Sequence, residues 1–223
     1  MNFKGVLLLK RDGFDYYEDK SGRILSFPFS LAVVNSLEIV NLEELKKQIK
    51  AFVEINKVLR ADLLIILSAD ILFEKDIQTQ DPNIQSQETQ KFLDIVPFES
   101  ISTKLLPMEQ GLRVITVNKN LVDAIRTSFE ETGFVIEGIV PYESLGQFSG
   151  INSLDIDASK TIIGQFDSLK EASFDFERGQ KKTIPQIESQ KDTSKATSLR
   201  LYIMLGIFGL LLLVLILLIV IGG

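Results

Sequence analysis

Residues 201–221 form an uninterrupted stretch of 21 residues without a charge, LYIMLGIFGLLLLVLILLIVI. As an α-helix, with a rise of ~1.5 Å per residue, it would be about 30 Å long, the thickness of the hydrocarbon core of a bilayer. A helix buried in a globular domain normally keeps one polar face, and this stretch has none. We therefore expect one transmembrane helix from Leu201 to Ile221, preceded by the folded part of the chain.

Charges beside the predicted span indicate its orientation. Lys191, Lys195 and Arg200 precede it, and no basic residue follows it. The positive-inside rule then predicts a single-pass protein of the cell (inner) membrane with its N-terminal domain in the cytoplasm. The same three basic residues are candidate contacts for lipid headgroups, because anionic lipids attract basic residues close to a span. Tyr202 stands where an interfacial aromatic residue is expected.

The N-terminus lacks the pattern of a leader, whereas the C-terminus has the pattern of an anchor. The apolar run from Val6 to Leu9 is too short for the core of a signal peptide, so no cleaved leader is expected. Only Gly222 and Gly223 follow the predicted span, which is typical of a tail anchor. Within the span, Gly206 and Gly209 have GxxG rather than GxxxG spacing, so the oligomeric state is left open.

Charge and composition divide the rest of the chain into two parts. Residues 1–176 carry 18 Lys and Arg against 27 Asp and Glu, a net charge of −9. This acidic balance predicts a folded domain that does not bind nucleic acid. Residues 177–200 carry 6 basic against 3 acidic residues, a net charge of +3, and include Pro185 with few large apolar residues. They are expected to form a flexible polar linker.

The sequence contains no Cys and no His. Disulfides, cysteine nucleophiles, zinc sites and serine–histidine catalysis are therefore excluded. The chain also lacks a GxxxxGK[ST] loop, a GxGxxG turn and the spacing of an EF-hand. We expect a protein that is not an enzyme, with no cofactor and no metal.

Apolar patterning in residues 1–176 predicts an α/β fold. Three strands, at residues 3–9, 14–18 and 23–29, are separated by Asp-Gly and Ser-Gly turns, which favours an antiparallel meander. Asn41 is the expected N-cap of a long helix, with Glu44 three residues on. The apolar positions of that helix are Leu42, Leu45, Ile49, Phe52, Val53 and Leu59.

The following segments alternate between strands and helices. Residues 61–67, ADLLIIL, are expected to form a central strand covered on both faces, whereas residues 78–90 are expected to be a loop, with Ser86 capping a short helix that ends before Pro97. Further strands are expected at 112–117 and 134–140, flanking a helix that runs from the cap Asn118 to Gly133, with Leu121, Val122, Ile125 and Phe129 inward. A last helix, with Ile162, Ile163, Phe166 and Leu169 inward, is expected to be capped by Asp157. All strands are assigned to one mixed sheet.

Four polar groups were weighed as sites. The acidic residues Asp12, Asp15, Glu18 and Asp19 favour a solvated face over a Mg²⁺ site, because Lys10, Arg11 and Lys20 lie among them. Ser68 and Asp70 follow the central strand, where open α/β sheets bind ligands, but a structural turn is favoured. Lys46, Lys47 and Lys50 are expected on a solvent face that could also dock an acidic partner. Asp155 and Asp157 are interpreted through helix capping.

Residues 92–146 resemble the actin-like platform proteins of type IV pilus assembly and type II secretion, the PilM-like and GspL-like proteins. The resemblance rests on Pro97-Phe98, on the segment Lys119 to Asp123, on Gly133-Phe134 and on Pro141. It implies a ribonuclease H or actin-like half-fold, of which this chain has room for one half. The phosphate turn of actin-like ATPases is not matched, since the first turn reads Leu9-Lys10-Arg11-Asp12-Gly13.

The resemblance and the predicted span together lead to a functional expectation. The chain would be a membrane-anchored cytoplasmic scaffold of a pilus or secretion assembly platform, with integral or peripheral membrane assembly proteins and membrane lipid as its partners. Two alternatives stay open, a membrane-tethered actin-like nucleotide-binding protein and a tail-anchored adaptor unrelated to pili.

Overall fold

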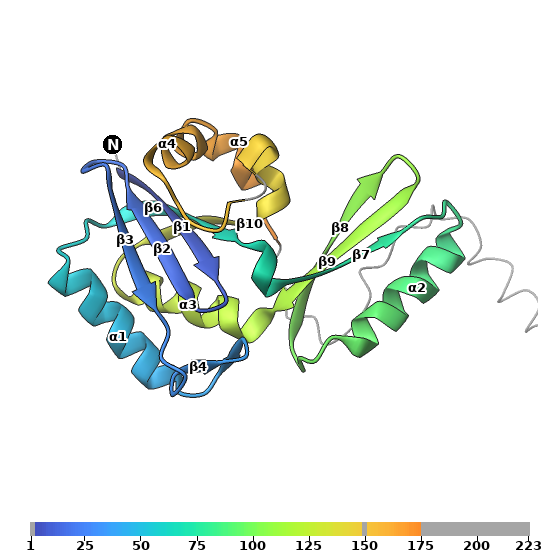
Figure 1. Ribbon diagram of the computed structural model, residues 1–223, viewed down its shortest axis with the longest axis horizontal. Coiled ribbons are helices and arrows are strands. Elements are labelled where there is room, and N and C mark those ends of the chain that lie inside the picture. The colour runs from blue at the N-terminus through green and yellow to red at the C-terminus, as the bar shows by residue number, and fades with distance from the viewer. Residues whose placement is uncertain (1–2, 149–150, 175–223) are drawn as a thin grey trace, which may run out of the picture. The chain divides into compact units, whose positions relative to one another are not determined.

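The computed structural model of the chain describes residues 3–148 and 151–174 (Figure 1). The predicted linker 177–200 and the predicted span 201–221 lie outside the described residues, as do the candidate headgroup contacts Lys191, Lys195 and Arg200. Among the helices in the described ranges, none is both long and apolar enough to cross a membrane.

A five-stranded mixed sheet is built from strands of both halves of the domain. Its strands are β1 (Phe3–Lys10), β2 (Gly13–Glu18), β3 (Arg23–Pro28), β6 (Ala61–Leu67) and β10 (Val135–Pro141), in the order β10-β6-β1-β2-β3. Strands β1, β2 and β3 form the predicted antiparallel meander. Strand β6 runs parallel to both β1 and β10, which confirms its predicted central position.

Helices cover both faces of this sheet (Figure 1). Helices α1 (Leu42–Ile55) and α3 (Lys119–Glu131) pack on one face, and α4 (Ile156–Gly164) and α5 (Phe166–Glu171) pack on the other. Alternate side chains of β6 therefore enter two different hydrophobic clusters, and Leu63 to Leu67 are fully buried. This is why the segment ADLLIIL is continuously apolar.

A second, three-stranded antiparallel sheet follows β6 and departs from the single sheet that we expected. It consists of β7 (Leu72–Ile77), β8 (Ile101–Met108) and β9 (Gly111–Asn118), in the order β7-β9-β8. The predicted strand 112–117 is therefore present as β9 but belongs to this sheet. A two-stranded pair, β4 (Val34–Asn35) and β5 (Glu38–Ile39), precedes α1. Because β7 and β8 contain several polar residues, neither strand was predicted from the sequence.

Helix α2 (Pro82–Ile95) occupies most of the segment that was expected to be a loop. Asp81 is its N-cap, with a side chain that accepts hydrogen bonds from the backbone N–H groups of Asn83 and Ile84, and Pro82 stands at the first helical position. Pro at that position is favourable because the missing N–H has no partner there in any helix. The prediction of Ser86 as the cap was wrong.

The other helix boundaries are partly as predicted. Asn41 caps α1 and Asn118 caps α3, and Gly133, with φ +95°, follows the end of α3. Helix α1 ends at Ile55, so Leu59 is not part of it.

The last predicted helix is two helices. Asp155, not Asp157, caps α4, because the side chain of Asp155 accepts the backbone N–H of Ala158. The helix is interrupted at Gln165, and α5 begins at the next residue. Ile162, Phe166 and Leu169 are buried as expected, and Ile163 is half-buried.

Candidate functional site

The carboxyl ends of the parallel strands β1, β6 and β10 meet at one edge of the large sheet. Open α/β sheets bind ligands at this edge. Short 3-10 helices continue the chain beyond two of these strands, Ala69–Ile71 after β6 and Tyr142–Phe148 after β10. Ser68, Asp70 and Glu143 therefore come from the edge where a ligand would be sought.

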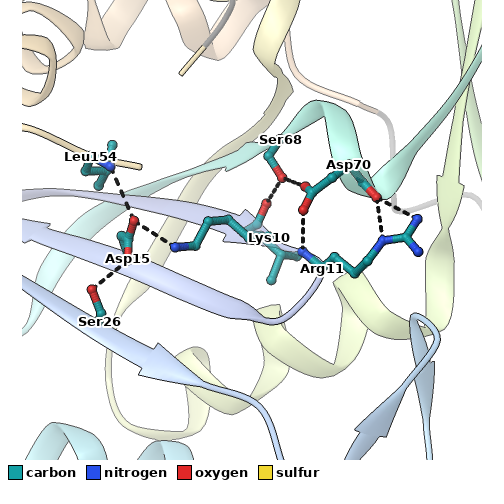
Figure 2. Close-up of polar contacts among 8 residues, drawn as sticks. Lys10, Arg11, Asp15, Ser26, Ser68, Asp70 and Leu154 are labelled. Atoms are coloured by element: carbon teal, nitrogen blue, oxygen red, sulfur yellow. Dashed lines mark hydrogen bonds and ion pairs between the residues drawn. The ribbon is translucent and has the colours of Figure 1, made fainter. Parts of the chain in front are cut away.

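The turn after β6 is closed by hydrogen bonds within the protein (Figure 2). The hydroxyl of Ser68 bonds the carbonyl oxygen of Leu9 at 2.7 Å and also the carboxylate of Asp70. The Asp70 carboxylate accepts the backbone N–H of Arg11 at 3.2 Å, and the Arg11 guanidinium donates to the Asp70 carbonyl oxygen at 3.1 and 3.2 Å. Ser68 and Asp70 thus make a structural turn that joins the ends of β1 and β6.

Two of the four acidic residues near the first turn are buried, so the expectation of a solvated face is wrong for them. Asp15 is 2% exposed and bonds Ser26 Oγ at 2.7 Å, Lys10 Nζ at 3.0 Å and the backbone N–H of Leu154 at 3.3 Å (Figure 2). Because Leu154 precedes α4, this carboxylate connects the meander to the segment that leads into the layer of α4 and α5. Only Asp12 and Asp19 of the group are exposed.

Glu18 is also 2% exposed and fully engaged. Its carboxylate accepts hydrogen bonds from Ser21, from Arg23 Nε at 3.1 Å and from the backbone N–H of Leu59 at 2.9 Å. Burial by itself raises the pKa of Glu18, but the bonds from Leu59, Ser21 and Arg23 outweigh it, and the pKa is lowered. In the described ranges no group of three or more metal-binding side chains is assembled, and the Mg²⁺ interpretation gains no support.

A second carboxylate cluster lies where β10 meets the three-stranded sheet. Burial, followed by the neighbouring Glu74 carboxyl, raises the pKa of Glu143 to about 7, although Arg113 opposes the shift. Burial also raises the pKa of the adjacent Tyr142 to about 12. Arg113 itself holds Asp76 through two bonds of 2.6 and 2.8 Å. Glu143 can therefore change its protonation near neutral pH, at the junction of the two sheets.

A hollow with a volume of about 900 Å³ lies along α1 and the C-terminal end of α3, and we call it the α1–α3 groove. Its basic residues are Lys46, Lys47, Lys50, Lys57 and Arg60. Its acidic lining residues are Glu43, Glu54 and Glu131. The buried Val53 and Val58 supply apolar surface between them.

A scan against protein-family models and a search of curated proteins find no match to this chain. Solved structures do match. A PilM–PilN type IV pilus biogenesis complex aligns with a TM-score of 0.43 and 10% identity, over 65% of this chain and 49% of that chain.

Two further solved structures show a similar level of likeness. The cytoplasmic domain of EpsL, an inner membrane component of the type II secretion system of Vibrio cholerae, aligns at a TM-score of 0.39 and 12% identity, over 64% of this chain and 58% of that chain. A Bacteroides thetaiotaomicron protein with an actin-like ATPase fold aligns at 0.38 and 9% identity, over 65% of this chain and 53% of that chain.

Two of these solved structures contain the kinds of platform protein that the 92–146 resemblance named. The chain spans about half the length of the solved structures it matches.

The three lysines predicted on one solvent face, Lys46, Lys47 and Lys50 (the lysine stripe), are not equally free to bind a partner. Lys46 is drawn into an ion pair of 2.6 Å with Glu131 of α3, whereas the side chains of Lys47 and Lys50 are 80% and 67% exposed. All three line the groove, as do Lys57 and Arg60, which the sequence analysis did not single out. The sequence carried no signal for these two residues, because their place in the groove depends on where α1 ends and on the path of the chain after it.

Proposed function

We propose that this chain is a membrane-anchored, non-enzymatic scaffold, with its α/β domain in the cytoplasm, that docks partner proteins in a pilus or secretion assembly platform. The observation that carries the proposal is the uncharged stretch 201–221, which follows a basic linker and an acidic folded domain. A segment of that length and apolarity is stable in lipid and would be a liability in water.

The geometry of the domain supports a scaffold over a catalyst. At the ligand-binding edge of the large sheet, the turn of Ser68 and Asp70 makes its hydrogen bonds to Leu9 and Arg11 within the protein. The α1–α3 groove instead lies on the helical face, between charged side chains and two valines. Such a surface suits recognition of a polypeptide.

The resemblance of residues 92–146 supports the choice of platform. Its residues fall at structural junctions, with Pro97-Phe98 leading to β8, Lys119 to Asp123 opening α3, and Gly133-Phe134 and Pro141 flanking or ending β10. The resembling segment therefore contains β8 and β9 of the second sheet, helix α3 and strand β10 of the first sheet. We assign the domain to one actin-like half on this basis.

Affinity capture tests the assembly-platform part of the proposal. The full-length chain, tagged at its N-terminus, is extracted in mild detergent from its native host, and pilus or secretion inner-membrane proteins are expected among the captured partners. A capture that repeatedly returns none of them would remove the platform assignment. Calorimetric titration with Mg-ATP should give no binding heat, and tight binding would replace the scaffold with a nucleotide-binding protein.

A further inference from the structure

Lys57 has an unusual backbone conformation for a lysine. Helix α1 ends with Asn56, and Lys57 follows at φ +50°, in the left-handed region. The backbone N–H of Val58 bonds the carbonyl of Val53 at 2.9 Å, six residues inclusive, which is the bond of a Schellman ending. Gly adopts this conformation without strain, and Lys does not. A side chain kept at a strained position is a pointer to function.

The charge of Lys57 is directed at the α1–α3 groove, where it joins other cations. In the described ranges Lys57 and Arg60 have no ion pair, and Lys47 and Lys50 make only 4.0 Å contacts with Glu44 and Glu54. This concentration of exposed positive charge belongs to a domain whose net charge over residues 1–176 is −9. The groove is lined by five basic and three acidic residues, so it carries a net positive charge on an acidic domain.

Shape and charge together select the occupant. A bilayer surface is flat and cannot follow a furrow between two helices, whereas a polypeptide can lay apolar side chains against Val53 and Val58. The chain's own linker 177–200 carries a net charge of +3 and would be repelled. An acidic segment of another protein satisfies both requirements.

We propose that the α1–α3 groove docks an acidic segment of a partner polypeptide, with Lys47, Lys50, Lys57 and Arg60 pairing its carboxylates. This rests on the proposed scaffold function and names the surface through which the scaffold holds a partner. In this proposal Lys57 is a recognition residue, and it stands at the left-handed position where Gly would end the helix without strain.

Lys57→Gly separates recognition from folding, because it removes the charge and also relieves the left-handed strain. The full chain in phosphatidylcholine nanodiscs is titrated with a fluorescein-labelled helical peptide that carries Glu on one face and Leu on the other. We expect binding that weakens about 3- to 10-fold in Lys57→Gly, while the midpoint of thermal unfolding rises. Lys160→Gln, on α4 at the other face of the sheet, removes the same charge and should leave the affinity unchanged.

Several outcomes would overturn the proposal. Equal weakening in Lys57→Gly and Lys160→Gln would mean attraction by overall charge alone. Equal binding of a peptide with Lys in place of Glu, or no binding at low salt, would remove the acidic partner. Unchanged affinity in Lys57→Gly would remove the role of that residue.

Lysine acetylation without peptide tests the other occupants. We expect Lys47, Lys50 and Lys57 to react freely at every protein concentration and in every lipid. Protection that appears only with phosphatidylglycerol in the nanodisc would assign the groove to the membrane, and protection that grows with protein concentration would assign it to a second copy. If the chain resides in membranes but does not bind the peptide, the docking role of the groove is refuted and the scaffold function is not. If the chain is found only in the soluble fraction, the scaffold function is refuted.

Discussion

Arg11 and Asp70 bond each other reciprocally, each using its backbone and its side chain. The backbone N–H of Arg11 donates to the Asp70 carboxylate, and the Arg11 guanidinium donates to the Asp70 carbonyl oxygen, although the residues are 59 apart in the sequence. They meet because β1 and β6 are parallel neighbours whose ends lie side by side. The pair holds together the segments that follow β1 and β6, at the edge of the sheet where many α/β proteins have an open loop.

Asp70→Ala should destabilise the domain by about 1 kcal/mol, since it removes an exposed acceptor of two hydrogen bonds. Asp70→Asn keeps one carbonyl oxygen as an acceptor and should lose less. The midpoint of urea unfolding, followed by circular dichroism on the detergent-solubilised chain, measures both. Equal midpoints for wild type and Asp70→Ala would show that this bonding contributes nothing to stability.

Glu18→Gln should cost about 2 to 3 kcal/mol at neutral pH, because a neutral amide replaces the buried carboxylate that accepts the hydrogen bonds of Arg23 and Leu59. The pKa of Glu18 is lower in the folded protein than its usual 4.5, so the folded state binds fewer protons and the stabilisation is present above pH 4.5. It is lost as the pH falls through the folded pKa, and wild type and variant should converge in acid.

The control for this change is Glu109→Gln, which removes the same charge from an exposed position in the β8–β9 turn. Its unfolding midpoint should stay close to that of wild type at every pH. A gap between Glu18→Gln and wild type that stays constant down to acidic pH would contradict the lowered pKa.

Glu143→Gln should have the opposite pH dependence. The pKa of Glu143 is raised to about 7 in the folded protein, so the carboxyl contributes stability that is full below pH 4.5 and is lost as the pH rises through about 7. The variant should be about 1 to 2 kcal/mol more stable than wild type at pH 8, an amount reduced for solvent screening, and not more stable at pH 4.

Unfolding of Glu143→Gln and wild type at the two pH values gives this difference directly. The groups facing Glu143 are Glu74, Arg113 and Tyr142, and none of them is altered. A variant that is no more stable than wild type at pH 8 would show that Glu143 is ionised without cost in the folded state.

Asp81→Ala should destabilise by about 1 kcal/mol, the usual cost of losing a helix N-cap. Ser86→Ala, at the residue that the sequence favoured as the cap, should cost little, because Ser86 lies inside α2 and Ala is the better helix former. The paired unfolding midpoints decide between the two boundaries. A larger loss from Ser86→Ala would contradict the structure's start of this helix.

Strong local patterns made much of the first sheet predictable. Strand β6 is apolar throughout, the meander is marked by Gly13 and Gly22, and α1 and α3 have an Asn cap followed by an apolar stripe. Each of these signals is contained in a few consecutive residues. The second sheet was missed because neither β7, with the charged run Glu74 to Asp76, nor β8, with Ser102 to Lys104, has a regular apolar pattern, and both strands pair only with β9.

The polar groups could not be placed from sequence, because their partners are far apart along the chain. In the sequence Asp15 has the pattern of a surface residue. In the structure its carboxylate accepts the backbone N–H of Leu154, which is 139 positions away. Glu143 acquires its raised pKa through burial and through Glu74 on another sheet. The lysine stripe was recognised, but its meeting with Lys57 and Arg60 depends on the path of the chain after α1.

Membrane fractionation of cells expressing the full-length chain with an N-terminal tag tests the central claim most directly. We predict that the chain sediments with membranes, resists carbonate extraction, and exposes its tag to protease only after the cells are opened. Recovery in the supernatant after ultracentrifugation without detergent, or a tag that is cleaved in intact cells, would contradict the account.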